Sequence, residues 1–256
     1  MAQPKVAAEY NSFASDYEAF IVNAPIGLLE TELFFRALGD PAGLTILDLG
    51  GGTGLRARQV VERGAKSVDV VDFAAGMLHA GKKEAEMAGF GEVIRWYEAD
   101  VSKPLSVNLE TSYDIVLANW VLDHAGSEED LHQMLTNATA YLKPGGRFVC
   151  VHTRDPRNPV YKTKKYGITL SNIEHMPGGL KYWVTLYGTD PPAEFSGTSL
   201  EVLYKETFEL CEKFGLVDLQ VVPFGDAQLV RNDAEFWKEW VEQPTMEFFT
   251  ARKNDQ

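Results

Sequence analysis

The feature that most constrains the fold is a glycine loop between an apolar run and an amphipathic run. The stretch ILDLGGGTGLRARQVVERGA, Ile46 to Ala65, holds four glycines in five positions. Such a pattern is typical of a strand that ends at a ligand, because backbone without side chains lets the ligand approach closely. The loop therefore predicts an open α/β sheet with a binding site at the carboxyl ends of its strands.

Strand and helix patterns alternate after this loop, which predicts a parallel sheet with right-handed crossovers. Strands are expected at 45–49, 67–72, 92–98, 113–119 and 147–153, with helices at 54–63, 75–88 and 128–141 between them. A strand at 216–222, a helix near 233–241 and a strand at 245–251 follow later in the chain. The expected fold is a Rossmann-like α/β fold with a seven-stranded sheet.

Two segments lie outside this alternation. The first is a helix ahead of the sheet, followed after Pro25 by a second helix at 26–38. The apolar positions that predict the first helix, at spacings of three and four, are Val6, Tyr10, Phe13, Tyr17 and Ile21. The second segment runs from Arg154 to Gly197, where the periodicity fails; such a long irregular stretch is usually functional. Thr198 and Glu201 then have the spacing of a capping box, which predicts a helix from there to Phe214.

Composition narrows the partners. The formal net charge is −13, which disfavours nucleic acid because phosphate backbones bind clusters of lysine and arginine. The two cysteines, Cys150 and Cys211, fit buried free thiols in a reducing compartment. The chain shows neither a secretory signal pattern nor an apolar run near the roughly 20 residues that span a bilayer. We expect a soluble cytoplasmic protein, monomer or homodimer, with no membrane or nucleic-acid partner.

Three classes of nucleotide-binding loop compete for the glycine loop. A dinucleotide fingerprint needs a third glycine where Leu55 stands, and a phosphate-binding loop needs Gly-Lys-Ser or Gly-Lys-Thr where Gly54-Leu55-Arg56 stands. The remaining pattern begins with Asp48, whose negative charge would repel a pyrophosphate. An acid at this position favours a cationic ligand.

The motif LDLGGGTG, Leu47 to Gly54, resembles that of class I S-adenosylmethionine-dependent methyltransferases. The resemblance continues in order through VVDFAAGML, YEADVSKPL, YDIVLANWVLDHAG and YLKPGGRFV, and it spans Thr45 to Thr153. It implies the class I methyltransferase fold and S-adenosylmethionine as cofactor, with S-adenosylhomocysteine as product. It further implies a single domain, divided into a helical lid at 1–40, a cofactor-binding core at 41–153, a substrate-cover insertion at 154–198 and a C-terminal helix and strands at 199–256.

The same resemblance implies a cofactor-binding set. Asp48 and the backbone of Gly50 and Gly52 would hold the methionine amino group and approach the ribose, Asp72 would bind the ribose hydroxyls, and Met77 would pack on adenine. The set is completed by Tyr17, Phe73, Asp100, Val101 and Asn119, with Asp100 and the Val101 backbone at the adenine edge. A loop cap is the alternative role for Asp100.

Four residues are candidates for a catalytic role near the transferred methyl group. Trp120 would offer its ring to the sulfonium or line the substrate slot, and Tyr10 would face the same space from the leading helix. His124 and His152 are the strand-end histidines, either of which could take a proton from a hydroxyl. Packing in the core is the alternative role for each of the four. An amine needs no base before attack, so the lack of a clear base favours nitrogen over oxygen as acceptor.

The irregular segment indicates the substrate class. Its rings, which suit an aromatic or heterocyclic small molecule, are Tyr161, Tyr166, Tyr182, Trp183, Tyr187 and Phe195. KYGITLSNIE from Lys165, TDPPAEFS from Thr189 and EFW at Glu235 are similar to segments of toxoflavin-biosynthesis-type N-methyltransferases of secondary metabolism. No metal is indicated. The competing hypothesis is a protein of this fold that binds S-adenosylmethionine for a non-methylating reaction or a regulatory role.

Overall fold

The computed structural model describes residues 3–12, 14–110, 112–188 and 190–255, and a seven-stranded sheet forms its centre. The strand order is β3-β2-β1-β4-β5-β10-β9. The strands are β1 (Thr45–Leu49), β2 (Ser67–Asp72), β3 (Ile94–Glu98), β4 (Tyr113–Asn119), β5 (Leu142–Thr153), β9 (Leu216–Val221) and β10 (Met246–Lys253). Neighbours from β1 to β5 are parallel, and β10 is antiparallel to β5 and β9. The predicted fold class is confirmed.

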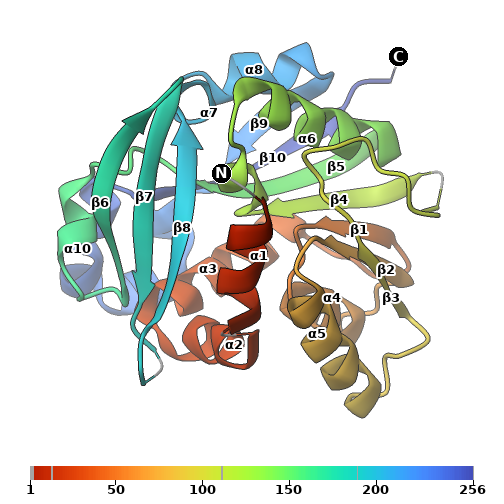
Figure 1. The fold of residues 1–256 in the computed structure, drawn as a ribbon, viewed down its shortest axis with the longest axis horizontal. Helices are drawn as coiled ribbons and strands as arrows, with labels where there is room; N and C mark the ends of the chain where they lie inside the picture. The colour runs from red at the N-terminus through yellow and green to blue at the C-terminus, as the bar shows by residue number, and fades with distance from the viewer. Residues whose placement is uncertain (1–2, 13, 111, 189, 256) are drawn as a thin grey trace.

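Helices cover both faces of this sheet, with α6 and α8 on one side and α4 and α5 on the other (Figure 1). Successive strand residues point to opposite faces, so Leu117 and Val149 join one apolar core while Val116 and Phe148 join the other. The helices that flank the sheet are α3 (Pro25–Leu38), α4 (Leu55–Glu62), α5 (Ala75–Met87), α6 (Glu128–Tyr141), α7 (Glu201–Lys205) and α8 (Thr207–Lys213). Ser127 caps α6 by accepting a hydrogen bond from Asp130 N, as its position indicates.

The leading segment is helical on both sides of residue 13, over α1 (Gln3–Ser12) and α2 (Ala14–Asn23). Phe13, part of the predicted apolar face, lies outside the described residues. Helix α1 lies across the centre of the molecule, between the large sheet and the strands labelled β6 to β8 (Figure 1). Glu9 Oε2 accepts hydrogen bonds from Ser196 N and Oγ, and Asn11 Oδ1 accepts one from Gly76 N. Helix α1 therefore bridges the two halves of the protein.

The segment read as irregular contains a second sheet. Its strands, which are antiparallel, are β6 (Ile168–Met176), β7 (Gly179–Leu186) and β8 (Ala193–Leu200). Two short helical turns come earlier in the chain: η1 (Val121–His124) follows β4, and η2 (Pro159–Lys162) precedes β6. In β7 every second side chain is buried, including Tyr182 and Val184. In β8 the buried side chains include the hydroxyls of Ser196, Thr198 and Ser199. A strand whose buried face is made of hydroxyls carries little hydrophobic periodicity, which explains why the sequence does not predict it.

The predicted capping box at Thr198 is wrong because this residue belongs to a strand. Thr198 lies in β8, and its Oγ1 donates to Asp123 O and Ala125 O. The predicted helix to Phe214 is two helices, α7 and α8, which meet at Glu206. The chain ends with η3 (Phe224–Asp226), α9 (Gln228–Asn232), α10 (Ala234–Glu242) and β10. None of the helices in the described part of the chain has the length and apolar character needed to cross a membrane.

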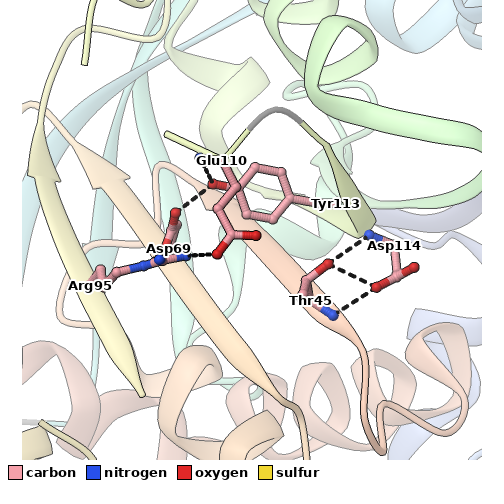
Figure 2. A network of polar contacts seen from close by, with 6 residues as sticks. All are labelled: Thr45, Asp69, Arg95, Glu110, Tyr113 and Asp114. Carbon is pink, nitrogen blue, oxygen red and sulfur yellow. Dashed lines mark hydrogen bonds and ion pairs between the residues drawn. The ribbon is translucent and has the colours of Figure 1, made fainter. Parts of the chain in front are cut away.

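A buried polar network fixes the strands next to β1 (Figure 2). Asp69 in β2 is fully buried and accepts hydrogen bonds of 2.5 Å from Arg95 Nε in β3 and from the Tyr113 hydroxyl in β4. Arg95 also pairs with Glu110, whose backbone N–H donates to the Tyr113 oxygen. The next residue of β4, Asp114, accepts hydrogen bonds from the backbone N–H and the hydroxyl of Thr45 in β1 (Figure 2). These contacts hold β1 between its neighbours.

We predict that Tyr113→Phe lowers the free energy of unfolding by about 1–3 kcal/mol, because it removes a hydrogen bond to a buried carboxylate. Urea denaturation followed by circular dichroism measures the change. Tyr141→Phe is the control, since Tyr141 is half-buried at the end of α6, away from this network. Equal stabilities of Tyr113→Phe and the wild type would contradict the structural role of the network.

Candidate active site

The glycine loop leaves the carboxyl end of β1 as bare backbone. Gly50, Gly52 and Gly54 have φ values of +69°, +56° and +66°, a region that favours glycine. A Cβ on Gly52 would lie 3.2 Å from Met77 Cε, and one on Gly50 would lie 2.6 Å from a methyl of Val121. The loop therefore has room for a ligand only while these positions carry no side chain.

A cavity with about 700 Å³ of empty space opens beside this loop. Its lining contains most of the predicted cofactor-binding set, with three of the four catalytic candidates. The predicted residues on its wall are Tyr10, Tyr17, Asp48, Gly50, Gly52, Phe73, Met77, Asn119, Trp120 and His124. We call this space the first cavity.

Two buried carboxylates make the first cavity electronegative. Burial raises the pKa of Asp48 to about 7, and the charge of Asp72 adds to this rise while Arg56 opposes it. Burial also raises the pKa of Asp72 to about 6, against the lowering effect of backbone N–H donors that include Ala74 and Gly52. Asp72 Oδ2 accepts from Gly52 N at 2.9 Å, so it lies directly beneath the glycine loop. Two acids brought together in this way favour a ligand that carries positive charge.

Several buried polar atoms at this cavity lack a hydrogen-bond partner within the described residues. They are Asp48 Oδ2, both side-chain polar atoms of Asn119, and Nδ1 of His124. Buried polar groups are normally satisfied, so a set of unsatisfied atoms on one cavity wall indicates a polar ligand. Donors and acceptors both occur in the set. A molecule with an ammonium group, hydroxyls and an electron-deficient centre fits this combination.

A second cavity, with about 620 Å³ of empty space, lies on the other side of α1 and α2. It is bounded by the small sheet and contains Tyr161, Tyr182 and Phe195 of the aromatic segment. Tyr166 instead packs on the aromatic side chains of α10, and the hydroxyl of Tyr187 pairs with Thr169. The walls shared by the two cavities are Tyr10, Tyr17, Ile21, Glu30, Trp120 and His124.

A tyrosine–histidine pair marks the junction of the two cavities. The Tyr10 hydroxyl lies 2.9 Å from His124 Nε2. Burial lowers the pKa of His124 to about 4 and raises the pKa of Tyr10, so both groups are neutral near pH 7. Trp120, between β4 and η1, has φ +62°, a strained conformation for a residue with a side chain that is found mostly at functional sites.

Four predicted site residues are not part of either cavity lining. Asp72 lies beneath the glycine loop, where its carboxylate accepts hydrogen bonds from Gly52 N and Ala74 N. His152 Nδ1 lies 2.8 Å from Thr153 O, and its Nε2 lies 3.6 Å from Glu247 Oε1 in β10, so its ring points into the sheet contact with β10. Asp100 Oδ1 accepts from Ser102 N and Oγ, which is the loop-cap arrangement. Val101 packs in the core beneath α6. His152 therefore lies outside both cavities, and its role beside the methyl group stays a prediction.

Three residues at the cavities were missed by sequence reasoning. Arg56 and Glu30 form a buried ion pair of 2.8 Å at the first cavity. The sequence signal for this pair was Glu30, a charged residue within an apolar helix, together with Arg56, a charge in the helix that follows the glycine loop. Asp123 lines the second cavity and is fully buried. It stands next to His124 in the motif VLDH, where the histidine drew attention first.

Comparison with known proteins agrees with this geometry. Residues 46–146 match the methyltransferase domain family. The match covers the glycine loop, both buried acids and the strand that ends at Asn119. The matched segment therefore contains the whole first cavity except the part contributed by α1 to α3.

The names of curated proteins similar to this chain place them in quinone biosynthesis. The demethylmenaquinone methyltransferase of Lactococcus lactis is 30% identical over 167 residues, which is 62% of this chain and 63% of that protein. The ubiquinone/menaquinone biosynthesis C-methyltransferase UbiE of Bartonella bacilliformis is 28% identical over 165 residues, 62% of this chain and 61% of the relative. The chain thus matches less than two thirds of the length of these relatives.

Solved structures extend the likeness in fold to the whole chain. The 1,6-didemethyltoxoflavin-N1-methyltransferase of Burkholderia thailandensis, with its substrate and S-adenosylhomocysteine bound, has a TM-score of 0.57 at 22% identity and covers all of this chain and 92% of that one. The CcbJ methyltransferase of Streptomyces caelestis has a TM-score of 0.63 at 19% identity and coverages of 94% and 96%. These structures confirm the predicted fold. S-adenosylmethionine stays the predicted cofactor.

We predict that the affinity for S-adenosylhomocysteine falls about tenfold between pH 8 and pH 6, because Asp48, with a pKa of about 7, loses the charge that attracts the ligand's ammonium group when it is protonated. Isothermal titration calorimetry at several pH values measures this dependence. Asp48→Asn is expected to flatten the profile, and Asp40→Asn, an exposed aspartate, is the control that retains it. An unchanged pH profile in Asp48→Asn would contradict the assignment.

Proposed function

We propose that this protein transfers the methyl group of S-adenosylmethionine to a small aromatic or heterocyclic metabolite held in the second cavity. The observation that carries the proposal is the contact of two cavities along shared walls that include Tyr10, Trp120 and His124. A methyl donor in one cavity and an acceptor in the other would meet at this junction. Methyl transfer depends mainly on such alignment and on the exclusion of water.

The residues of the first cavity fit the cofactor. S-adenosylmethionine supplies an electrophilic methyl group when bound. We assign Asp48 to the methionine ammonium, Asp72 to the ribose hydroxyls and Met77 to the adenine face, in agreement with their burial and charge. Asn119 offers an amide whose buried polar atoms are unsatisfied within the described residues. Gly50, Gly52, Tyr17 and Phe73 complete the contacts, and Asp100 and Val101 close the adenine end in this assignment.

Helices α1 and α2, in the proposed lid at 1–40, exclude water from the reacting groups. Tyr10 in α1 and Tyr17 in α2 line both cavities. Glu9 and Asn11 join α1 to the small sheet and to α5. Entry of both ligands requires these contacts to open, since α1 lies between the two halves of the protein (Figure 1).

The neutral Tyr10–His124 pair favours nitrogen as the acceptor. A hydroxyl, or a phenolic ring that accepts at carbon, needs a base to remove a proton, and a base works best when its pKa lies near the ambient pH. The pKa of His124, about 4, makes it a weak base. A nitrogen with a free lone pair needs no base. The C-methyltransferase names of the curated relatives make carbon the competing acceptor.

The decisive test uses methyl-deuterated S-adenosylmethionine and a fractionated metabolite extract, followed by mass spectrometry. We expect a small molecule that gains three deuterium atoms, together with S-adenosylhomocysteine. The control is Asp72→Ala, which should bind the cofactor more weakly by about 1.5–3 kcal/mol. A wild-type protein that binds S-adenosylmethionine and labels nothing, or that consumes a metabolite without loss of the donor, would support the regulatory or non-methylating alternative instead.

We predict that Tyr10→Phe lowers kcat/KM for methyl transfer about tenfold, since misplacement of the acceptor by a lost contact is costly. The ring remains, so the affinity for S-adenosylhomocysteine should stay within about twofold by calorimetry. Tyr187→Phe is the matched control, because its hydroxyl contacts Thr169 outside both cavities. A Tyr10→Phe enzyme with wild-type kcat/KM would rule out a role for the pair.

A further inference from the structure

We propose that the second cavity selects acceptors that carry a hydrogen-bond donor and no negative charge, and that Asp123 is the residue that recognises the donor. The inference rests on the proposed function and adds a substrate class to it. It concerns a residue that lies beside the Tyr10–His124 pair but plays no part in the methyl-transfer geometry described above.

The walls of the second cavity are largely apolar. Aromatic rings of Trp120, Tyr161, Tyr182 and Phe195 face it together with aliphatic side chains from α2, α3 and the small sheet. Among the described residues on this wall there is no lysine or arginine. Planar walls of this kind hold a ring system, and the few polar groups among them determine its orientation.

Asp123 is an ionisable group of this wall with remaining hydrogen-bond capacity. Its Oδ2 accepts from Thr153 N at 2.7 Å and its Oδ1 accepts from Ser199 Oγ at 2.9 Å. The hydroxyl of Thr153 also lies within reach of the carboxylate. A carboxylate has about four acceptor positions, so these three donors leave one for a ligand. The donors hold the carboxylate in one position at the cavity wall. A flexible acid on the surface would orient a ligand less well.

The charges around the cavity favour the same class of acceptor. Glu30, the other acid on the wall, is paired with Arg56 at 2.8 Å. His124 is neutral, since burial lowers its pKa to about 4. The basic group that does influence Asp123 is the His152 ring, which lies 3.6 Å from Glu247. Burial raises the pKa of Asp123 only to about 6, so it is mostly ionised at pH 7.

An anionic acceptor would lose its hydration in this cavity and meet a fixed negative charge. A neutral N–H or O–H group, or an ammonium, would instead donate to the remaining acceptor position of Asp123. Aromatic ring faces add a further preference for cations. We therefore assign neutral or cationic ring systems with a donor group to this cavity and exclude acceptors that carry a carboxylate or phosphate.

Four naphthalene probes of similar size test the assignment by calorimetry, with S-adenosylhomocysteine present and absent. They are 2-naphthylmethylamine, which is cationic, 2-naphthol, which is a neutral donor, 2-methoxynaphthalene, which has no donor, and 2-naphthoate, which is anionic. We expect the amine to bind at least about tenfold more tightly than the methyl ether, the worth of one hydrogen bond to a charged group, with 2-naphthol between them and 2-naphthoate weakest.

Asp123→Asn should reduce the advantage of the amine over the methyl ether to less than about threefold. Ile168→Val is the matched control: it changes the apolar wall of the same cavity, leaves Asp123 and its donors in place, and should keep the advantage. Thermal melting shows whether each variant is folded. If Asp123→Asn does not fold, the wild-type order of the four probes decides.

Tight binding of 2-naphthoate, an equal affinity for amine and ether, or no binding of any probe to the wild type would overturn the assignment. A folded Asp123→Asn that keeps the full advantage would also overturn it. Failure of the proposed function is seen separately, as absent binding of S-adenosylhomocysteine or absent label transfer on the same preparation, because the order of probe affinities does not depend on turnover.

Discussion

The position of β1 between β2 and β4 is the constraint on which the rest of the structure depends. The chain builds β2 and β3 on one side of β1 and then crosses to build β4 and β5 on the other. Connections that leave a strand in opposite directions open a crevice at its carboxyl end. The Asp69 and Asp114 networks tie the three strands together nearer their amino-terminal ends, at Thr45 of β1 and at Tyr113 and Asp114 of β4 (Figure 2). The cavity beside the glycine loop follows from this topology.

The first cavity lies mostly in the segment that matches the family, and the second lies mostly outside it. The first is built by the matched domain, where buried acids would be costly unless a cationic ligand met them. The second is built mainly by the lid helices and the small sheet, which lie outside residues 46–146, and Trp120, Asp123 and His124 of the matched segment complete its wall. The Tyr10–His124 pair is among the residues that line both cavities. Most of the wall that faces the acceptor can thus change without any change in how the cofactor is held.

Much of the first cavity could be predicted because its signals are local. The glycines need positive φ, and Asp48 and Asp72 end apolar strands, so sequence places them directly. The second cavity depends on contacts between distant segments: Ser196 with Glu9, and Ser199 with Asp123. Hydroxyl side chains buried by such contacts look like surface residues in a sequence. A strand-end position does not tell which face of the sheet a side chain joins, and the ring of His152 lies on the face that carries Glu247.

A crystal structure with S-adenosylhomocysteine bound tests the central claim, that methyl donor and acceptor meet at the shared wall of the two cavities. The claim predicts the amino group beside Asp48, the ribose hydroxyls on Asp72, and the sulfur directed past Tyr10 and His124 toward the second cavity. A sulfur that faces away from the second cavity, or a ligand bound elsewhere, would contradict it.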